Sequence, residues 1–420
     1  MATLYVNGST GNNARDGLAE IDLNAVIAGR GPKASIYNGT TGAIDVAAAG
    51  DTIRIARGTY TAPTGGIQVK KSLYIRGEQG TVINPFGASA NEPCIVIDPN
   101  GVLLDRVEIS DLSLQNTNRP AAFTSGNYGL KIKVNVAGSK LTRLYLNNVS
   151  VNNMGDSGFY LVAAGTSDEV VVFCRMDRCW STSNWGFGLE AGYVQPFTID
   201  DSYFLLNSKD GAYCDNCEAR FSSCAFENNE RDSSRDATFA AQCRLHACLI
   251  ARVDSCHFEN FNLEFPAISN GATVSGTGIP GGTTVSGAVS AGAKQLTLSA
   301  NATASGYSTL TIGGTAFSNC LITAGSPTVY YGQFNQHALN IENCPAATVL
   351  ECMFINPSES TDVTQRGIYL DYIGTGNLHS LIGPQRMSFV KTAIQVANAT
   401  NDVDVYLPFI GSGTGTVTLR

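Results

Sequence analysis

Glu227 and Glu259 occupy matching positions in two copies of a repeated phrase, residues 221–227 (FSSCAFE) and 253–259 (VDSCHFE). If the two copies stack as neighbouring strands, their carboxylates lie about 5 Å apart. Like charges that close raise the pKa of one carboxyl group, and an acid with a carboxylate partner is what cleavage of a glycosidic bond needs. The pair is therefore a candidate for acid/base catalysis, with His257 beside it as a third candidate.

Asp177 and Asp200 form a second pair of the same kind, at an earlier position of the phrase. The alternative for both pairs is that acidic residues at the corners of a repetitive fold are solvated turn residues, since charged networks also perturb pKa values without catalysis.

Trp180 and Tyr203 fall on one outward row of the same pattern, two residues before the position of the glutamates. Exposed aromatic rings can pack against the apolar faces of sugars. Arg178 and Lys209 are further candidates for substrate binding. With His257 and Tyr203 they are also the bases available for a β-elimination from a uronic acid.

These side chains are positioned by one unit that recurs eight times: an apolar residue, two polar residues, a small or apolar residue, a spacer and another apolar residue. Its central residues are 112, 149, 179, 202, 224, 256, 320 and 352. The second and third inward residues are two apart, as in a strand. The first and second are three apart, so the chain must bend between them to keep both side chains inward. Each phrase therefore predicts strand, corner, strand.

The steps between these residues are 22 to 37 residues long, except for one of 64. A repeat of this length that cannot bury its apolar face alone, with loops added at some turns, is typical of a solenoid. Stacked repeats predict a Cys/Val/Leu row, a Leu/Val/Phe row and an asparagine row of residues 116, 153, 228, 260 and 356, in which each buried amide bonds the next. This is the pattern of an all-β, right-handed parallel β-helix, and residues 45–400 resemble the pectate-lyase-like superfamily.

Composition agrees with that fold class, because 44 glycines and only 15% charged residues suit many tight turns and short strands. The net charge of −8 argues against a nucleic-acid partner. No apolar run reaches the length of a membrane span, so we expect no membrane insertion. The first residues lack the layout of a signal peptide, which predicts synthesis in the cytoplasm or a leader already removed.

The 12 cysteines are mostly expected to be reduced packing residues, because five of them take the inward position of the phrase. Cys214, Cys217, Cys243 and Cys248 could be considered as a zinc site. Their spacing is poor for zinc, so we expect no metal and no other cofactor.

The expected organisation is an N-terminal strand and cap (1–49), a β-helix (50–400) interrupted by a small β insert (271–314), and C-terminal strands (401–420). The insert alternates Val, Leu and Ile with Thr and Ser. Its string VSGTGIPGGTTV resembles a module of bacteriophage tail-fibre and other virion proteins.

Together these features resemble a bacteriophage tailspike. The resemblance implies a virion protein that trimerises, contacts other tail proteins and binds a bacterial surface polysaccharide, with depolymerisation of that polysaccharide left open. The alternatives are a secreted, extracellular polysaccharide lyase or glycoside hydrolase, which would explain the outward carboxylates, and a structural virion fibre without catalysis.

Overall fold

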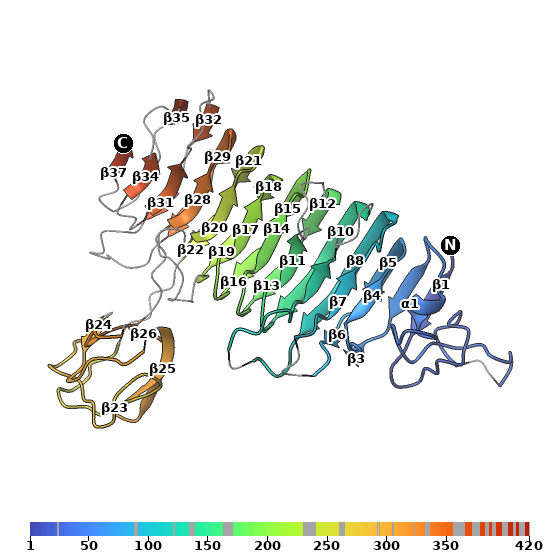
Figure 1. Ribbon diagram of the computed structural model, residues 1–420, viewed down its shortest axis with the longest axis horizontal. Helices are drawn as coiled ribbons and strands as arrows, with labels where there is room; N and C mark the ends of the chain where they lie inside the picture. Colours follow the sequence, from blue (N-terminus) through green and yellow to red (C-terminus); the bar gives the residue numbers. More distant parts are fainter. Residues whose placement is uncertain are drawn as a thin grey trace.

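The computed structural model describes residues 1–22, 25–87, 91–120, 122–133, 139–162, 171–229, 241–259, 265–291, 293, 295–304, 306–322, 324–331, 337–355, 366–371, 379–382, 386–388, 392–396, 402–405, 409–410 and 416–419. In these residues the chain is an all-β solenoid whose strands stack in parallel as successive rungs (Figure 1). The fold class expected from the sequence, a parallel β-helix, is confirmed.

Each coil contributes three strands, which form three faces of the solenoid. The first face contains β1 (Thr3–Val6), β2 (Thr52–Ile55), β5 (Leu73–Gly77), β12 (Val171–Asp177), β15 (Phe197–Asp200), β18 (Glu218–Ser222), β21 (Ile250–Asp254), β29 (Ala346–Leu350), β32 (His379–Ile382) and β35 (Asp402–Val405). The second face contains β3 (Gly58–Thr61), β6 (Thr81–Asn84), β13 (Trp180–Thr182), β16 (Tyr203–Leu205), β19 (Ala225–Glu227), β22 (His257–Glu259), β30 (Met353–Ile355), β33 (Arg386–Ser388) and β36 (Phe409–Ile410). Two longer strands, β8 (Leu103–Gln115) and β10 (Lys140–Asn152), continue from the first face onto the second.

The third face is a separate 11-stranded sheet. It contains β4 (Ile67–Val69), β7 (Ile95–Ile97), β9 (Leu130–Ile132), β11 (Phe159–Val162), β14 (Leu189–Gly192), β17 (Ala212–Asp215), β20 (Ala241–His246), β28 (His337–Glu342), β31 (Arg366–Asp371), β34 (Thr392–Val396) and β37 (Thr416–Leu419). The strands β35, β36 and β37 pair in parallel with the coil before them. The solenoid thus continues through the residues expected to form distinct C-terminal strands.

Left-handed backbone at single residues makes the corners. The residue before the central position of the phrase has φ between 46° and 58° in seven coils, at Asp111, Asn148, Arg178, Asp201, Ser223, Ser255 and Glu351. This one residue turns the chain between the first and second faces while the residues on both sides remain extended. The bend expected from the three-residue step is therefore a single left-handed residue.

The core is filled by rows of like side chains. Phe204, Phe226, Phe258 and Phe354 stack on successive rungs with ring centroids 5.2, 5.0 and 4.8 Å apart. Val149, Cys179, Ser202, Cys224, Cys256 and Cys352 are all buried at the central position. All 12 cysteines are buried and none forms a disulfide, as expected of packing residues.

The buried amide row differs from the expected one. It runs through Asn184, Asn207, Asn229 and Gln242, with each side-chain amide donating to the next over 2.7 to 2.8 Å. Asn153 and Asn228 instead adopt left-handed backbone at the second corner, which turns the following side chain inward and moves the row by one residue. Asn116 is buried and bonds Asn127, while Asn260 and Asn356 lie outside the described residues.

Cys320 was wrongly placed in the core row of the solenoid. It lies in β26 of a separate antiparallel sheet formed by β23 (Val274–Ser275), β24 (Gln295–Thr297), β25 (Gly306–Ile312), β26 (Thr315–Ile322) and β27 (Thr328–Tyr331). This sheet has its own apolar cluster, from Phe265 to Val329, so the independent unit is wider than the expected 271–314. Its alternating residues have the same pattern as the phrase. In the solenoid Cys352 follows Cys256 directly, because β30 pairs with β22.

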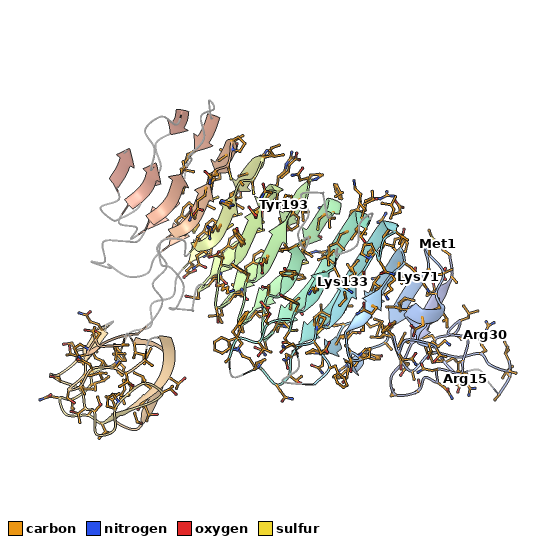
Figure 2. All side chains as sticks on the ribbon, in the orientation of Figure 1. Met1, Arg15, Arg30, Lys71, Lys133 and Tyr193 are labelled. Atoms are coloured by element: carbon orange, nitrogen blue, oxygen red, sulfur yellow. The ribbon has the colours of Figure 1, made fainter. Side chains whose placement is uncertain are left out.

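The N-terminal end carries β1 and one short helix, α1 (Ala43–Val46). The Lys71 Nζ donates to the carbonyl oxygens of Ile44, Asp45 and Ala47 at the end of that helix (Figure 2). Lys71 thereby fastens the helix to the first coils. No helix within the described part of the chain is long and apolar enough to cross a membrane.

Candidate functional site

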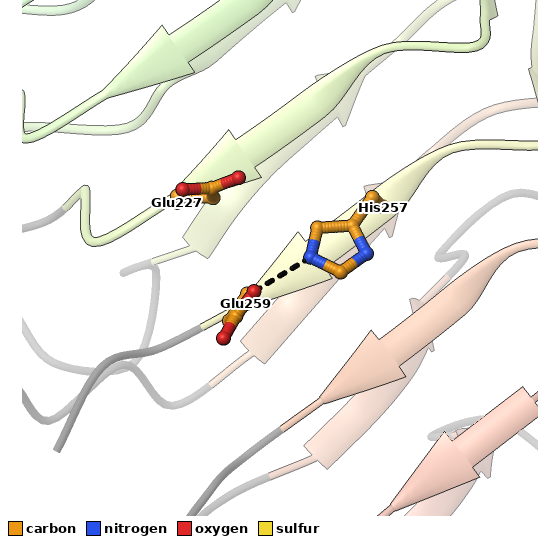
Figure 3. A group of neighbouring side chains, drawn as sticks. All are labelled: Glu227, His257 and Glu259. Atoms are coloured by element: carbon orange, nitrogen blue, oxygen red, sulfur yellow. Dashed lines mark hydrogen bonds and ion pairs between the residues drawn. The ribbon is translucent and has the colours of Figure 1, made fainter.

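The structure brings Glu227, His257 and Glu259 together on the second face (Figure 3). Glu227 ends β19 and Glu259 ends β22, and the two residues are direct register partners. The His257 Nε2 lies 2.8 Å from the Glu259 Oε2. One ligand atom from each of the three residues lies within 4.8 Å of the other two.

The two carboxyl groups have different surroundings. Burial raises the pKa of Glu227, and the neighbouring Glu259 raises it further, against the opposing effect of His257. Glu259 instead holds the hydrogen bond to the His257 imidazole. The raised pKa of Glu227 therefore makes it the candidate for the acid of the pair.

The same three side chains are a donor set for a divalent metal. Two carboxylates and one imidazole suit zinc or manganese better than calcium, which takes more oxygen ligands. Among the described residues this is the one group that brings three such atoms within 4.8 Å of one another. The four cysteines considered for zinc do not gather into such a group.

Trp180 and Tyr203 lie on the same face, two and one rungs before Glu227. Their rings stack on each other with centroids 4.3 Å apart and planes inclined by 22°. Each side chain remains about two-fifths exposed, at 43% and 37%. Because each ring covers one face of the other, a sugar can contact only the outer faces and the edges of the pair.

Asp177 and Asp200 are not part of this cluster, because they end strands of the first face. They are register partners there, and each is engaged by an arginine: Asp177 lies 3.2 Å from the Arg178 Nε, and Asp200 lies 3.3 Å from the Arg175 Nη2. Burial raises the pKa of Asp200, with a further contribution from Asp177 and an opposing one from Arg175. Arg178 is itself a left-handed corner residue between the two faces.

Lys209 lies apart from Trp180 and Tyr203. Its Nζ is 4.9 Å from the centre of the Phe187 ring and 5.0 Å from that of Phe123. Phe187 in turn stacks on Tyr213 of the third face. Lys209 therefore belongs to a cluster that sequence reasoning did not identify.

Through Phe187 and Tyr213 this cluster adjoins a row of titratable side chains on five consecutive rungs of the third face: Lys131, Tyr160, Glu190, Tyr213 and Arg244. Burial raises the pKa of Tyr160, raises that of Tyr213 to about 12, and lowers that of Lys131. The two phenols that flank Glu190 therefore remain protonated donors at neutral pH.

A sequence signal for this row exists. Tyr160, Glu190 and Tyr213 each follow the central residue of their own phrase, at 149, 179 and 202, by 11 residues. A constant offset places residues at one position of every coil. The signal is lost on either side, where longer connections precede Lys131 and Arg244.

Comparison with solved structures places the fold among proteins of known architecture. The enzymatically active domain of tailspike protein 2 from bacteriophage CBA120 superposes with a TM-score of 0.54 at 10% identity, over 84% of this chain and 43% of that one. This chain has the parallel β-helix fold of that domain. It spans less than half of the tailspike domain's length.

Pectate lyase Pel9A superposes with a TM-score of 0.49 at 11% identity, over 97% of this chain and 79% of that one. The A-module of the Azotobacter vinelandii mannuronan C-5 epimerase AlgE4 superposes with a TM-score of 0.42 at 13% identity, over 87% of this chain and 91% of that one. No protein-family model and no curated protein sequence matches the chain.

Proposed function

We propose that this chain is a bacteriophage tailspike-type protein that binds a bacterial surface polysaccharide and hydrolyses it at Glu227 and Glu259. The observation that carries the proposal is the pair of carboxylates on neighbouring rungs, within 4.8 Å of each other, beside an exposed aromatic pair. Likeness in fold to a phage tailspike domain supports the virion assignment.

In this proposal Glu227 is the general acid, because burial and its charged neighbour keep it protonated to higher pH than an ordinary glutamate. Glu259 is the nucleophile, and His257 positions it. Glu227 gives its proton to the glycosidic oxygen as Glu259 bonds to the anomeric carbon and the leaving sugar departs. Water, deprotonated by Glu227, then displaces the glycosyl group from Glu259 and completes hydrolysis.

The separation of the two carboxylates favours this retaining mechanism, with a covalent intermediate on Glu259. Inverting glycosidases keep their two carboxyl groups about 6.5 to 9.5 Å apart to admit a water molecule, whereas retaining enzymes keep them at about 5 to 5.5 Å. A pair with oxygens within 4.8 Å therefore fits the retaining arrangement.

Trp180, Tyr203 and Arg178 are proposed to hold the polymer next to the reacting pair. Tyr203 lies one rung before Glu227 and two residues back along the strand, a backbone separation of about 8 Å from rung spacing and rise. Long side chains at that distance reach a common ligand.

The proposal includes a homotrimer in the phage tail that contacts other virion proteins. A secreted lyase or hydrolase and a structural fibre are the competing functions, and one experiment separates hydrolysis, elimination and the absence of cleavage. The protein is incubated with capsular and lipopolysaccharide preparations from candidate hosts, and both new reducing ends and the ultraviolet absorbance of a new double bond are followed. Reducing ends alone support hydrolysis. Both signals together would show elimination. The absence of both signals would support the structural fibre.

A further inference from the structure

The first face carries a hollow that the proposed site does not use. Two cavities of about 790 and 460 Å³ adjoin there, since Arg76 and Asp111 line both. Together they extend over six consecutive rungs, from β1 to β12, and we call them the first-face groove. At about 4.8 Å for each step between rungs, the groove follows the solenoid axis for roughly 24 Å.

The charges in the first-face groove cancel. Four arginines and four acidic residues line it, and no lysine or histidine does. Arg54 pairs with Glu78 at 3.2 Å, Arg76 with Asp111 at 3.2 Å and Arg106 with Glu108 at 2.7 Å. A polyanion would gain no net attraction from such a lining, which excludes the electrostatic mode of nucleic-acid binding.

The lining instead alternates fixed donors and acceptors. A guanidinium group only donates hydrogen bonds and a carboxylate only accepts them, whereas a sugar hydroxyl can do both. A hydroxyl can therefore bridge each pair, and exposed pairs such as Arg76 and Asp111, with side chains 69% and 30% exposed, contribute little to stability when they rearrange.

Aromatic rings hold this lining in place. The Arg106 guanidinium lies 4.5 Å from the centre of the Tyr145 ring and 5.2 Å from that of Tyr74. Such cation–π contacts fix the direction in which the guanidinium donates. The groove is thus a channel lined mainly by charged and polar residues, with the Arg106 guanidinium held in a fixed direction.

The groove also leads toward the proposed catalytic face. Asp177 lines its far end, and the next residue, Arg178, is the corner after which the chain continues as β13 with Trp180. A polymer that leaves the groove therefore meets the aromatic pair.

From this geometry we infer that the first-face groove binds an uncharged stretch of the polysaccharide. The inference rests on the proposed function and narrows its substrate class to neutral glycans. A neutral sugar lacks the carboxylate that acidifies the proton at C5, so β-elimination is not available to such a substrate and only hydrolysis remains.

The test is made in the Glu227→Gln background, so that no glycan is cut during binding. The probe is an array of neutral and uronic-acid-containing bacterial oligosaccharides of equal length, and binding is measured at low and high salt. Asp111→Asn and Arg76→Ala alter the groove, and asparagine tolerates the left-handed backbone at Asp111. Arg252→Ala is the matched control, because Arg252 forms a similar exposed pair with Asp254 on the same face but outside the groove.

We expect neutral glycans to bind with little dependence on salt, both groove variants to weaken binding at least fivefold, and Arg252→Ala to bind unchanged. Binding confined to acidic glycans, no glycan binding, or groove variants that bind as well as the control would overturn the inference. The proposed hydrolysis is judged separately from cleavage by the unaltered protein, so the two can fail independently.

Discussion

The buried amide row offers a direct test of what stabilises the coils. Asn207 is completely buried. Its Oδ1 accepts from the Asn184 Nδ2 and backbone N at 2.8 and 3.3 Å, and its Nδ2 donates to the Asn229 Oδ1 and the Ser181 carbonyl at 2.8 and 3.1 Å. Asn207→Ala removes all four bonds. At about 1 kcal/mol net for each, we expect the free energy of unfolding to fall by about 4 kcal/mol.

The assay is urea unfolding followed by tryptophan fluorescence. The chain has two tryptophans, Trp180 and Trp185, and both lie within five residues of Asn184, so the signal reports on the affected coils. A lower midpoint with an unchanged slope would show lost stability rather than a changed unfolded state. The matched control is Asn152→Ala, because Asn152 is half-buried and donates one long bond, 3.4 Å, to the Ser113 Oγ. Equal midpoints for the two variants would refute the reasoning.

Three further predictions concern the insert, the acid and the aromatic pair. Replacing residues 265–331 by a short Gly/Ser link should leave a cooperative melt of the solenoid, because the insert buries its own apolar cluster; a deletion variant that melts without cooperativity contradicts this. The raised pKa of Glu227 predicts that hydrolysis is lost as pH rises through that value, above the ordinary range of a glutamate, because the acid must carry its proton; a pH–rate profile whose basic limb lies at the pKa of an ordinary glutamate contradicts the assignment. Trp180→Ala should weaken polysaccharide binding by about 1 kcal/mol, measured by affinity electrophoresis, and unchanged mobility would place the polymer elsewhere.

The repeated phrase predicted the stacking of the coils because every coil must place apolar residues at the same inward positions. Val149, Cys179 and Cys256 must fill the same cross-section of the core, so their positions are visible in a single sequence. Cys320 shows where this pattern fails, because alternating apolar residues in an antiparallel hairpin have the same sequence pattern as a coil of the solenoid. Only the pairing of β22 with β30 shows which phrase follows Cys256.

The candidate site was predictable in part for the same reason. Glu227 and Glu259 keep a fixed distance from the phrase, so their adjacency could be inferred, as could that of Trp180 and Tyr203. Lys131 and Arg244 follow longer connections, and nothing local shows which face they reach. The asparagine row was displaced by one residue because a left-handed corner at Asn228 reverses the side on which the next amide lies.

The central claim, that Glu227 and Glu259 cleave the polysaccharide, is tested most directly by comparing three glutamine variants on one cleaved substrate. Glu190→Gln is the reference, since Glu190 is the central carboxylate of the third-face row. We expect Glu227→Gln and Glu259→Gln to bind the polymer normally and to lose at least a hundredfold in the rate of reducing-end release, while Glu190→Gln retains it. Loss of cleavage in Glu190→Gln alone would contradict the account and move the chemistry to the third face.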